Sequence, residues 1–345
     1  MLIRFFTSVT KNQNICTAVQ AQIFLPEQNI PKKCSYICLS FCFPTIMIHT
    51  IDLLFLGSPQ TIAAFLLETT DGAVLIETGP HSTIHNLQNG LQDLGYTLDD
   101  IRHVFITHIH LDHAGAAWDF AQRGATIYLH PAGQTHLAKP EKLMHSARRI
   151  YQDQMDRLWG RMEAIAPERL RPVEHGETIK IGDTPIVDWH TPGHASPHIA
   201  WHVHDMVFSG DVAGVRIEGG MPVAPCPPPD IDLAAWLQSI NILQNLDLQR
   251  LYLTHFGAVT DVAAHLQALQ QNLLSLVDWM RPHYEAQTPP ETIKPLFAEF
   301  VTQQLLQSGV DQQLLSAYEL ANPSWMSVAG LLRYWAKQNP QAPHA

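Results

Sequence analysis

Three histidines and one aspartate lie within six consecutive residues, directly after an apolar run that is typical of a β-strand. They are His108, His110, Asp112 and His113. Side chains alternate between two faces in an extended segment, so the first two histidines project to the same side and can bind one cation together. The other two side chains fall where we expect a helix, over residues 113–121, which directs them to a second position. Imidazole nitrogen and carboxylate oxygen suit zinc, manganese and ferrous iron, so the stretch predicts a metal site.

Three more side chains of the same ligand types follow downstream, each just past an expected strand. They are His194 after the run 184–189, Asp211 after the run 206–207, and His255 after the run 251–252. Ligands carried on the strand ends and short loops of a rigid sheet are what a preorganised metal centre requires. Any one of these segments alone is common. The order of all seven side chains predicts that they converge on one centre.

With this order of ligands, the chain resembles the metallo-β-lactamase-fold hydrolase superfamily over about residues 47–260. The resemblance implies one metal held by His108, His110 and His194, a second metal held by Asp112, His113 and His255, and Asp211 bridging the two. An aspartate at the bridging position resembles the glyoxalase II and lactonase branches more than the true β-lactamases, which often have cysteine there. The wider match resembles a bacterial and archaeal subgroup whose substrate the resemblance does not name.

One position departs from the family pattern. Members usually carry Asp-x-Gly after the third strand, whereas this chain has Glu77 in the segment Glu77-Thr78-Gly79. In the family this acidic side chain orients the metal ligands without binding metal itself, and such partners matter for metal affinity. We expect the same role for Glu77, with its contact displaced because the side chain is one methylene longer. A turn or helix-capping role is the alternative.

The resemblance implies a metal-dependent hydrolase that acts on a small molecule. Two divalent ions, zinc with iron or manganese as alternatives, would lower the pKa of a shared water toward neutrality. The hydroxide would attack an ester, thioester or lactone carbonyl, with Asp112 and Asp211 as the catalytic carboxylates. Because imidazoles must be neutral to bind metal, activity and metal content are expected to fall together below about pH 6. The same signature leaves two alternatives open, a mononuclear iron persulfide dioxygenase and a phosphodiesterase.

An insert with a helical pattern, roughly residues 140–160, separates the first ligand cluster from the later ligands. Arg148 and Tyr151 in this insert are candidates for holding a substrate carboxylate or protonating a leaving group, since the fork of an arginine matches carboxylate geometry. A packing helix with solvated arginines is the alternative. His198, four residues after His194, is a third candidate for substrate contact, with a structural role as its alternative.

The remaining patterns predict an α/β fold, an αββα sandwich with a C-terminal helical extension. Residues 61–69 and 73–78 have the pattern of paired strands around an Asp-Gly turn, and residues 82–94 have that of a helix. Strands and helices alternate in both halves, which fits two sheets packed face to face with helices outside. Helix-like segments over residues 261–345 form the extension, and their apolar stripes are expected to face the core or a homodimer partner.

Composition limits the partners of the chain. Only 21 of the 345 residues are Lys or Arg, the formal charge is −11, and no basic run stands out. A nucleic-acid partner is therefore not expected, because such binding depends on basic side chains that neutralise phosphates, and neither is an anionic membrane surface. The 46% hydrophobic and 15% charged content is typical of a cytoplasmic enzyme with a large core.

Residues 1–46 differ from the rest of the chain. They hold four of the five cysteines, and the spacing of four residues between three of them is not the Cys-x-x-Cys of zinc or iron–sulfur sites. The apolar stretch 35–47 is interrupted by Pro44, short for a membrane span of about 20 residues, and late for a signal peptide. We therefore expect the catalytic domain, residues 47–260, to begin at Met47 after an N-terminal extension that is poorly ordered or mis-annotated.

Overall fold

The computed structural model describes residues 3–7, 19–23 and 46–339. The chain forms two units, Met1–Met47 and Ile48–Ala345. In the first unit, strand β1 (Ile3–Thr7) pairs with strand β2 (Val19–Ile23) in antiparallel fashion. Most of residues 1–46 lie outside the described ranges, so the hypothesis that they form a poorly ordered or mis-annotated extension stays a prediction.

The first half of the second unit forms a six-stranded mixed sheet. Its first three strands are antiparallel neighbours and its last three run parallel, each parallel strand being reached through a helical crossover. In spatial order the strands are β3 (Ile48–Asp52), β4 (Ala63–Thr69), β5 (Gly72–Ile76), β6 (His103–Phe105), β7 (Thr126–Leu129) and β8 (Leu170–Pro172). The predicted hairpin around Asp71-Gly72 is therefore the β4–β5 pair.

The second half builds another six-stranded sheet, in which all pairs are antiparallel except β12 with β13. In spatial order its strands are β14 (Gly257–Val259), β13 (Arg250–Leu253), β12 (Met206–Phe208), β11 (Ile199–Val203), β10 (Thr184–His190) and β9 (Thr178–Ile181). Helix α7 (Leu233–Gln244) supplies the crossover between the two parallel strands.

Aromatic side chains fill the space between the two sheets. Phe105 of the first sheet meets Trp201 of the second edge-on, with ring centroids 4.9 Å apart, and the Trp201 indole N–H donates to the carbonyl of Ile106. Phe65 meets Tyr252 edge-on at 5.4 Å and lies tilted against Phe208 at 5.3 Å. Large flat side chains bury much apolar surface each, and their contacts fix how the sheets face one another.

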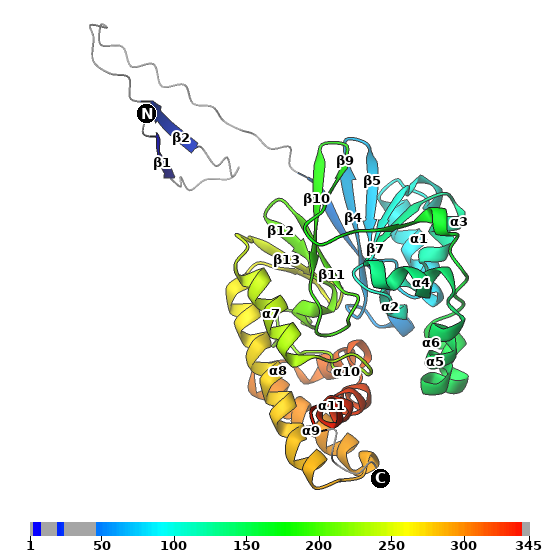
Figure 1. The fold of residues 1–345 in the computed structure, drawn as a ribbon, viewed down its shortest axis with the longest axis vertical. Coiled ribbons are helices and arrows are strands. Elements are labelled where there is room, and N and C mark those ends of the chain that lie inside the picture. The colour runs from blue at the N-terminus through cyan, green and yellow to red at the C-terminus, as the bar shows by residue number, and fades with distance from the viewer. Residues whose placement is uncertain (1–2, 8–18, 24–45, 340–345) are drawn as a thin grey trace, which may run out of the picture. The chain divides into compact units, whose positions relative to one another are not determined.

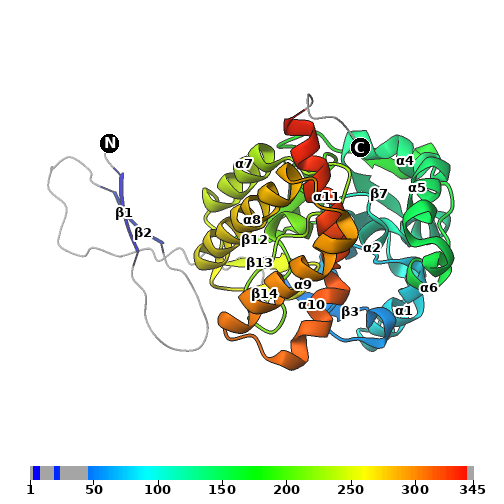
Figure 2. The same cartoon turned by 90° about the horizontal axis from the view of Figure 1, so that it is seen from below.

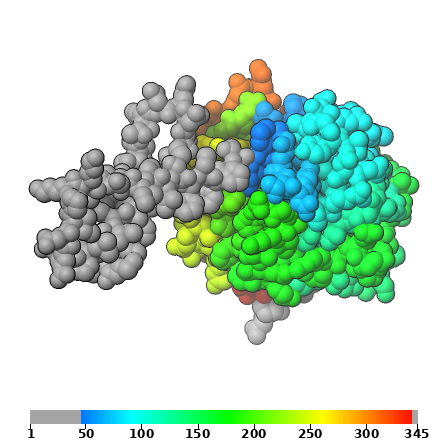
Figure 3. All heavy atoms as spheres, turned by 90° about the horizontal axis from the view of Figure 1, so that it is seen from above, coloured from blue at the N-terminus to red at the C-terminus, as the bar shows by residue number. Residues whose placement is uncertain are grey.

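Helices cover both outer faces, and Figures 1 and 2 show the resulting four layers. The outer face of the first sheet carries α1 (Ile84–Asp93), α3 (Ala117–Gln122) and α4 (Gln134–Ala138), and the second carries α7 and α8 (Val262–Glu285). In the space-filling view the blue and cyan first half abuts the green and yellow second half (Figure 3). This arrangement confirms the predicted αββα sandwich.

The C-terminal helices pack on the core of the second half and belong to the same compact unit as the sheets. They are α8, α9 (Pro290–Gln307), α10 (Leu315–Ala321) and α11 (Ser324–Gln338). The predicted helical extension is therefore confirmed as a part of the main body. Among the described helices, none combines the length and apolar character that crossing a membrane requires.

Two predicted helices differ from the structure. The helix expected over residues 113–121 is two short helices, α2 (Leu111–Ala114) and α3, because the chain bends at Gly115 and Ala116. The insert contains α5 (Glu141–Tyr151) and the single-turn helix α6 (Met155–Leu158). The short helix α2 begins one residue after His110, so this helix positions the ligands Asp112 and His113.

Candidate metal centre

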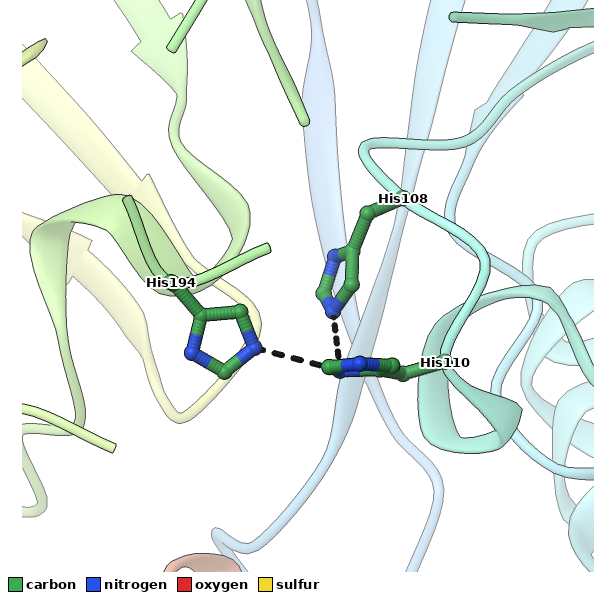
Figure 4. A group of neighbouring side chains, drawn as sticks. All are labelled: His108, His110 and His194. Carbon is green, nitrogen blue, oxygen red and sulfur yellow. Dashed lines mark hydrogen bonds between the residues drawn. The ribbon is translucent and has the colours of Figure 1, made fainter. Parts of the chain in front are cut away.

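Three of the predicted ligands, His108, His110 and His194, bring their imidazole nitrogens together at the ends of β6 and β10. Nε2 of His108 lies 2.8 Å from Nδ1 of His110, and Nε2 of His194 lies 3.1 Å from the same atom. In Figure 4 the dashed lines from His108 and from His194 both end on the His110 ring, and His194 comes from a different part of the chain than the other two. All three ligand atoms lie within 4.8 Å of one another, so one cation can bind all three.

Gly193 makes the approach of His194 possible. It has a φ of 141°, and its Cα lies so close to Trp236 of α7 that a Cβ at this position would overlap the tryptophan. Only glycine combines this backbone conformation with this contact. The Thr-Pro-Gly-His segment is thus shaped by α7 as well as by the strand before it.

The other ligands form a second group. The side chains of Asp112, His113 and His255 place one ligand atom each within 4.8 Å of the others, with Nε2 of the two histidines 3.8 and 3.6 Å from Oδ2 of Asp112. Asp112 and His113 lie in α2, while His255 follows β13 of the opposite sheet. The two sheets therefore contribute to both groups.

Asp211 lies between the two groups and turns one oxygen to each. Its Oδ2 is 3.2 Å from Nε2 of His194, and its Oδ1 is 3.3 Å from Nε2 of His113 and 3.4 Å from Nε2 of His255. The side chain is buried. A carboxylate in this position can bridge two cations, which is the role that the resemblance implies for Asp211.

Most of the ligand histidines have their second ring nitrogen fixed by a hydrogen bond. Nδ1 of His113 donates to Glu77, that of His194 to the carbonyl of Pro225 at 2.9 Å, and that of His255 to the carbonyl of Thr61 at 2.6 Å. Such bonds set the tautomer, leaving Nε2 as a lone-pair donor, and hold the ring in orientation. His110 differs, because it turns Nδ1 toward the centre.

Divalent cations fit these residues. Nε2 of His113 and Oδ1 of Asp211 are enclosed, and neither has a hydrogen-bond partner in the described part of the chain. Enclosed polar atoms without partners are costly, and two such atoms facing each other in a ring of imidazoles are explained by a shared cation. The nitrogen and oxygen donors suit zinc, iron or manganese, and no described cysteine side chain joins them.

The electrostatics differ between the two groups of ligand histidines. Burial lowers the pKa of His110 to about 4 and that of His108 well below its usual value, so both rings are neutral. Burial alone would raise the pKa of Asp112, but the neighbouring His113 outweighs it and the pKa falls to about 2. In the second group, the charges of Asp211 and Asp112 outweigh burial and raise the pKa of His113 and His255, so a cation bound there has to displace protons from these two imidazoles.

Glu77 connects the two groups of ligands. Its Oε1 accepts from Nδ1 of His113 at 3.0 Å, from Oγ1 of Thr107 at 2.5 Å and from Oγ1 of Thr254 at 3.3 Å. The Thr107 hydroxyl in turn accepts from Nδ1 of His108 at 3.0 Å. The side chain is fully buried, and its backbone has a φ of 64°, which is rare for a residue other than glycine. The predicted ligand-orienting role of Glu77 would use these contacts, and the role itself stays a prediction.

The residues expected to contact substrate have different positions. Tyr151 ends α5 next to the centre, where burial and the negative charge of Asp112 both raise its pKa. Arg148 is exposed on α5. The structure goes against a substrate contact for His198, which is fully buried. Its Nε2 accepts from the backbone N–H of Asp211 at 3.3 Å, its Nδ1 bonds Oγ1 of Thr191 at 2.8 Å, and its ring lies against His108. This side chain positions two ligands and does not face substrate.

Several residues that orient the ligands were not among the predicted site residues. A threonine precedes two of the ligand histidines, as Thr107-His108 and Thr254-His255, and both threonines donate to Glu77. This repeated Thr-His pair is a sequence pattern from which a supporting role of the two threonines could have been predicted. The carbonyls of Thr61 and Pro225 carry no such signal, because any residue type supplies a carbonyl.

The Pro225 carbonyl is held in place by α11. Ser327 of α11 accepts from the Cys226 backbone N–H at 3.3 Å, and Arg333 and Lys337 donate to the carbonyl of Pro229. Gly330 packs so closely that a Cβ there would overlap the Cys226 carbonyl. The C-terminal helix therefore fixes the loop that orients His194. Cys226 itself is buried, which raises the pKa of its thiol and disfavours the reactive thiolate.

Comparison with known proteins agrees with this centre. The family model described as the Metallo-beta-lactamase superfamily matches residues 57–255, more than half of the chain. The chain belongs to the metallo-β-lactamase superfamily. The match includes all seven predicted ligand positions, from His108 to His255. Members of the metallo-β-lactamase superfamily are generally metal-dependent hydrolases.

Two curated relatives are similar in sequence. A metallo-beta-lactamase fold-containing protein of Sulfurisphaera tokodaii is 25% identical over 206 residues, which cover 59% of this chain and 75% of the relative. An atrochrysone carboxyl ACP thioesterase of Aspergillus aculeatus is 24% identical over 162 residues, covering 44% of this chain and 42% of the thioesterase. The resemblance to the glyoxalase II and lactonase branches in particular stays a prediction.

Solved structures of metallo-β-lactamase superfamily proteins share the fold. A family protein from Thermus thermophilus has a TM-score of 0.60 at 19% identity and covers 86% of this chain and 95% of its own. A superfamily protein from Sulfolobus tokodaii has a TM-score of 0.56 at 23% identity, with coverages of 67% and 87%. At these identities the likeness demonstrates the architecture alone.

Proposed function

We propose that the chain is a hydrolase with a two-ion centre that cleaves a carbonyl ester, thioester or lactone of a small molecule. The observation that carries the proposal is the position of Asp211, with one oxygen toward His194 and the other toward His113 and His255. Two cations, zinc with iron or manganese as alternatives, supply when bound an acidified water and an electrophile for the carbonyl oxygen. The first would be held by His108, His110 and His194, the second by Asp112, His113 and His255.

The side chains around the centre have separate tasks in this reaction. Asp211 fixes the spacing of the two groups, and Asp112 stays ionised because its pKa is about 2. An ionised carboxylate beside the attacking water accepts a hydrogen bond from it and orients it toward the carbonyl carbon. Glu77 and the Thr61 and Pro225 carbonyls hold the imidazoles, so little reorganisation accompanies the reaction.

Two features support a carbonyl substrate over a phosphodiester. One curated relative is named as a thioesterase, although this chain spans less than half of it. The acidic chain offers few basic side chains for an anionic substrate, since only 21 of 345 residues are Lys or Arg.

The test combines metal analysis with a substrate panel. The purified protein is expected to contain two divalent ions per chain and to hydrolyse thioesters or lactones, while aryl phosphodiesters and a persulfide with oxygen are left unchanged. Asp211→Ala is expected to abolish hydrolysis and to lower the metal content, with Asp261→Ala, a surface aspartate paired with Arg216, as the matched control. Iron at one ion per chain with oxygen uptake on persulfide, or a fully active Asp211→Ala variant, contradicts the proposal.

A further inference from the structure

Three aromatic side chains from two distant segments meet beside the metal centre. Tyr151 ends α5, Trp159 follows α6, and Trp325 is the second residue of α11. The Tyr151 ring meets Trp159 at 5.0 Å with an interplanar angle of 70°, and Trp325 at 5.9 Å with an angle of 77°. Tyr151 is thus edge-on to both indoles. We call these three side chains the aromatic corner.

The aromatic corner is connected to the metal-binding segment by packing. Leu111, which lies between the ligands His110 and Asp112, belongs to a buried cluster with Met155 of α6, and Tyr151 and Trp159 pack against that cluster. The helices α2, α5, α6 and α11 all lie at the same end of the two sheets (Figure 1). The effect of Asp112 on the pKa of Tyr151 also requires the two side chains to be close.

The aromatic corner is not closed off by the rest of the chain. All three residues are half-buried, unlike Trp118, Trp201 and Trp236, which are fully enclosed in the cores. The Trp159 indole N–H has no acceptor within the described ranges, although it is shielded from water. An enclosed donor without a partner costs free energy, and an acceptor brought by a ligand would offset that cost.

We propose that the aromatic corner binds the acyl part of the substrate, and that this acyl part carries a planar aromatic group. The proposal rests on the proposed function, because it places the cleaved carbonyl at the metal centre and the ring against Tyr151, Trp159 and Trp325. One face of the Trp159 indole is stacked on Phe55, with ring centroids 5.6 Å apart. The exposed parts of the half-buried Tyr151 and Trp325 rings are therefore the surfaces that give an incoming ring stacked or edge-on contacts, the arrangements that aromatic pairs prefer.

Other occupants fit less well. A quaternary ammonium group needs aromatic faces arranged around it, whereas here the rings touch one another, and the cations at the centre would repel it. A carboxylate or phosphate needs basic partners, and the insert's Arg148 is exposed to solvent, with no described contact to the aromatic corner. A flat neutral group is the class that these side chains recognise.

The test uses two thioesters that differ only in the acyl part, S-acetyl- and S-phenylacetyl-N-acetylcysteamine. The phenylacetyl compound is expected to have the higher kcat/KM by about tenfold or more, the usual effect of an apolar group in a matching pocket. Trp325→Ala and Trp325→Leu are expected to bring this ratio close to one with metal content unchanged. The control Trp279→Ala removes an indole that stacks on Phe300 in the distant α8–α9 pair and should keep the ratio.

A binding measurement separates the two proposals. The matching ketones, with a methylene in place of the thioester sulfur, cannot be hydrolysed, and their dissociation constants are measured by calorimetry. Tighter binding of the benzyl ketone that is lost in both Trp325 variants supports the aromatic corner, even if neither thioester is cleaved. Absence of cleavage would contradict the proposed function only. Equal affinities of the two ketones, or a preference that survives both Trp325 variants, overturns the aromatic corner.

Discussion

Glu77→Gln tests whether the buried carboxylate holds the two groups of metal ligands in place. Gln has the same shape and keeps an oxygen for His113, but it carries no charge. In the structure, Oε1 of Glu77 receives Nδ1 of His113 at 3.0 Å and Oγ1 of Thr107 at 2.5 Å, and Thr107 in turn fixes His108. The substitution therefore weakens the support of one histidine in each group.

The size of the effect follows from these two bonds. A hydrogen bond to a charged group contributes about 1.5–3 kcal/mol and a neutral one about 0.5–1.5 kcal/mol, so each bond loses about 1 kcal/mol. Both bonds are fully buried, and solvent does not weaken them further. A loss of about 2 kcal/mol corresponds to roughly 30-fold weaker metal binding, within the range of 10- to 100-fold for groups that orient ligands.

The assay is competition for zinc with a coloured chelator, with ions per chain counted before and after. Glu68→Gln is the matched control, because Glu68 accepts from Nε2 of His49 at 2.9 Å in a similar pair between β3 and β4, away from the centre. This control should bind zinc as the unchanged protein does. If Glu77→Gln also binds zinc with unchanged affinity, the carboxylate does not support the ligands and the reasoning is wrong.

Two further predictions concern the surroundings of the centre. Gly330→Ala should push the loop at Cys226 away from α11, which should lower the melting temperature of the protein and the number of ions bound per chain. The control Ala329→Gly, on the exposed face of α11, should cost only about 1 kcal/mol of stability and leave the ion count unchanged. Burial lowers the pKa of His265 to about 4, so below pH 6.5 the unfolded chain takes up a proton that the folded chain refuses, and stability is lost as the pH falls from 6.5 to 4. His265→Gln keeps a donor for the Ala213 carbonyl but cannot take up this proton, so it should recover about 2–3 kcal/mol of the lost stability at pH 4.5. The measurement is urea unfolding of the metal-free protein, and a variant whose stability depends on pH as that of the unchanged protein does would contradict the prediction.

The candidate metal ligands could be predicted from the sequence because histidine and aspartate are metal-binding residue types and several of them lie only one to three residues apart. His108 and His110 lie two apart after a strand, and this alternation alone places them on one side. The bridging position of Asp211 could be inferred only through the family resemblance, since nothing local to a Ser-Gly-Asp triplet indicates a bridge. Its two differently directed oxygens appear only when three chain segments come together.

The positions that sequence reasoning misjudged or missed depend on contacts between distant segments. His198 was a candidate for substrate because it lies near a ligand in the chain, but the strand that follows it carries it into the interior against His108. Carbonyl acceptors such as those of Thr61 and Pro225 leave no trace in residue types. Trp325 is one apolar residue of a helical stripe in the sequence, and its contact with Tyr151 joins two segments that are far apart in the chain.

The C-terminal helix α11 joins the metal centre and the aromatic corner into one structural unit. Its middle, at Ser327 and Gly330, holds the loop whose Pro225 carbonyl orients His194, while its beginning supplies Trp325 to the aromatic corner. A rigid helix cannot move one contact without moving the other, because both are fixed to the same backbone within six residues. A shift of the whole helix would therefore disturb the loop at His194 and the aromatic corner together, whereas Trp325→Ala removes one side chain and leaves the contacts of Ser327 and Gly330 in place.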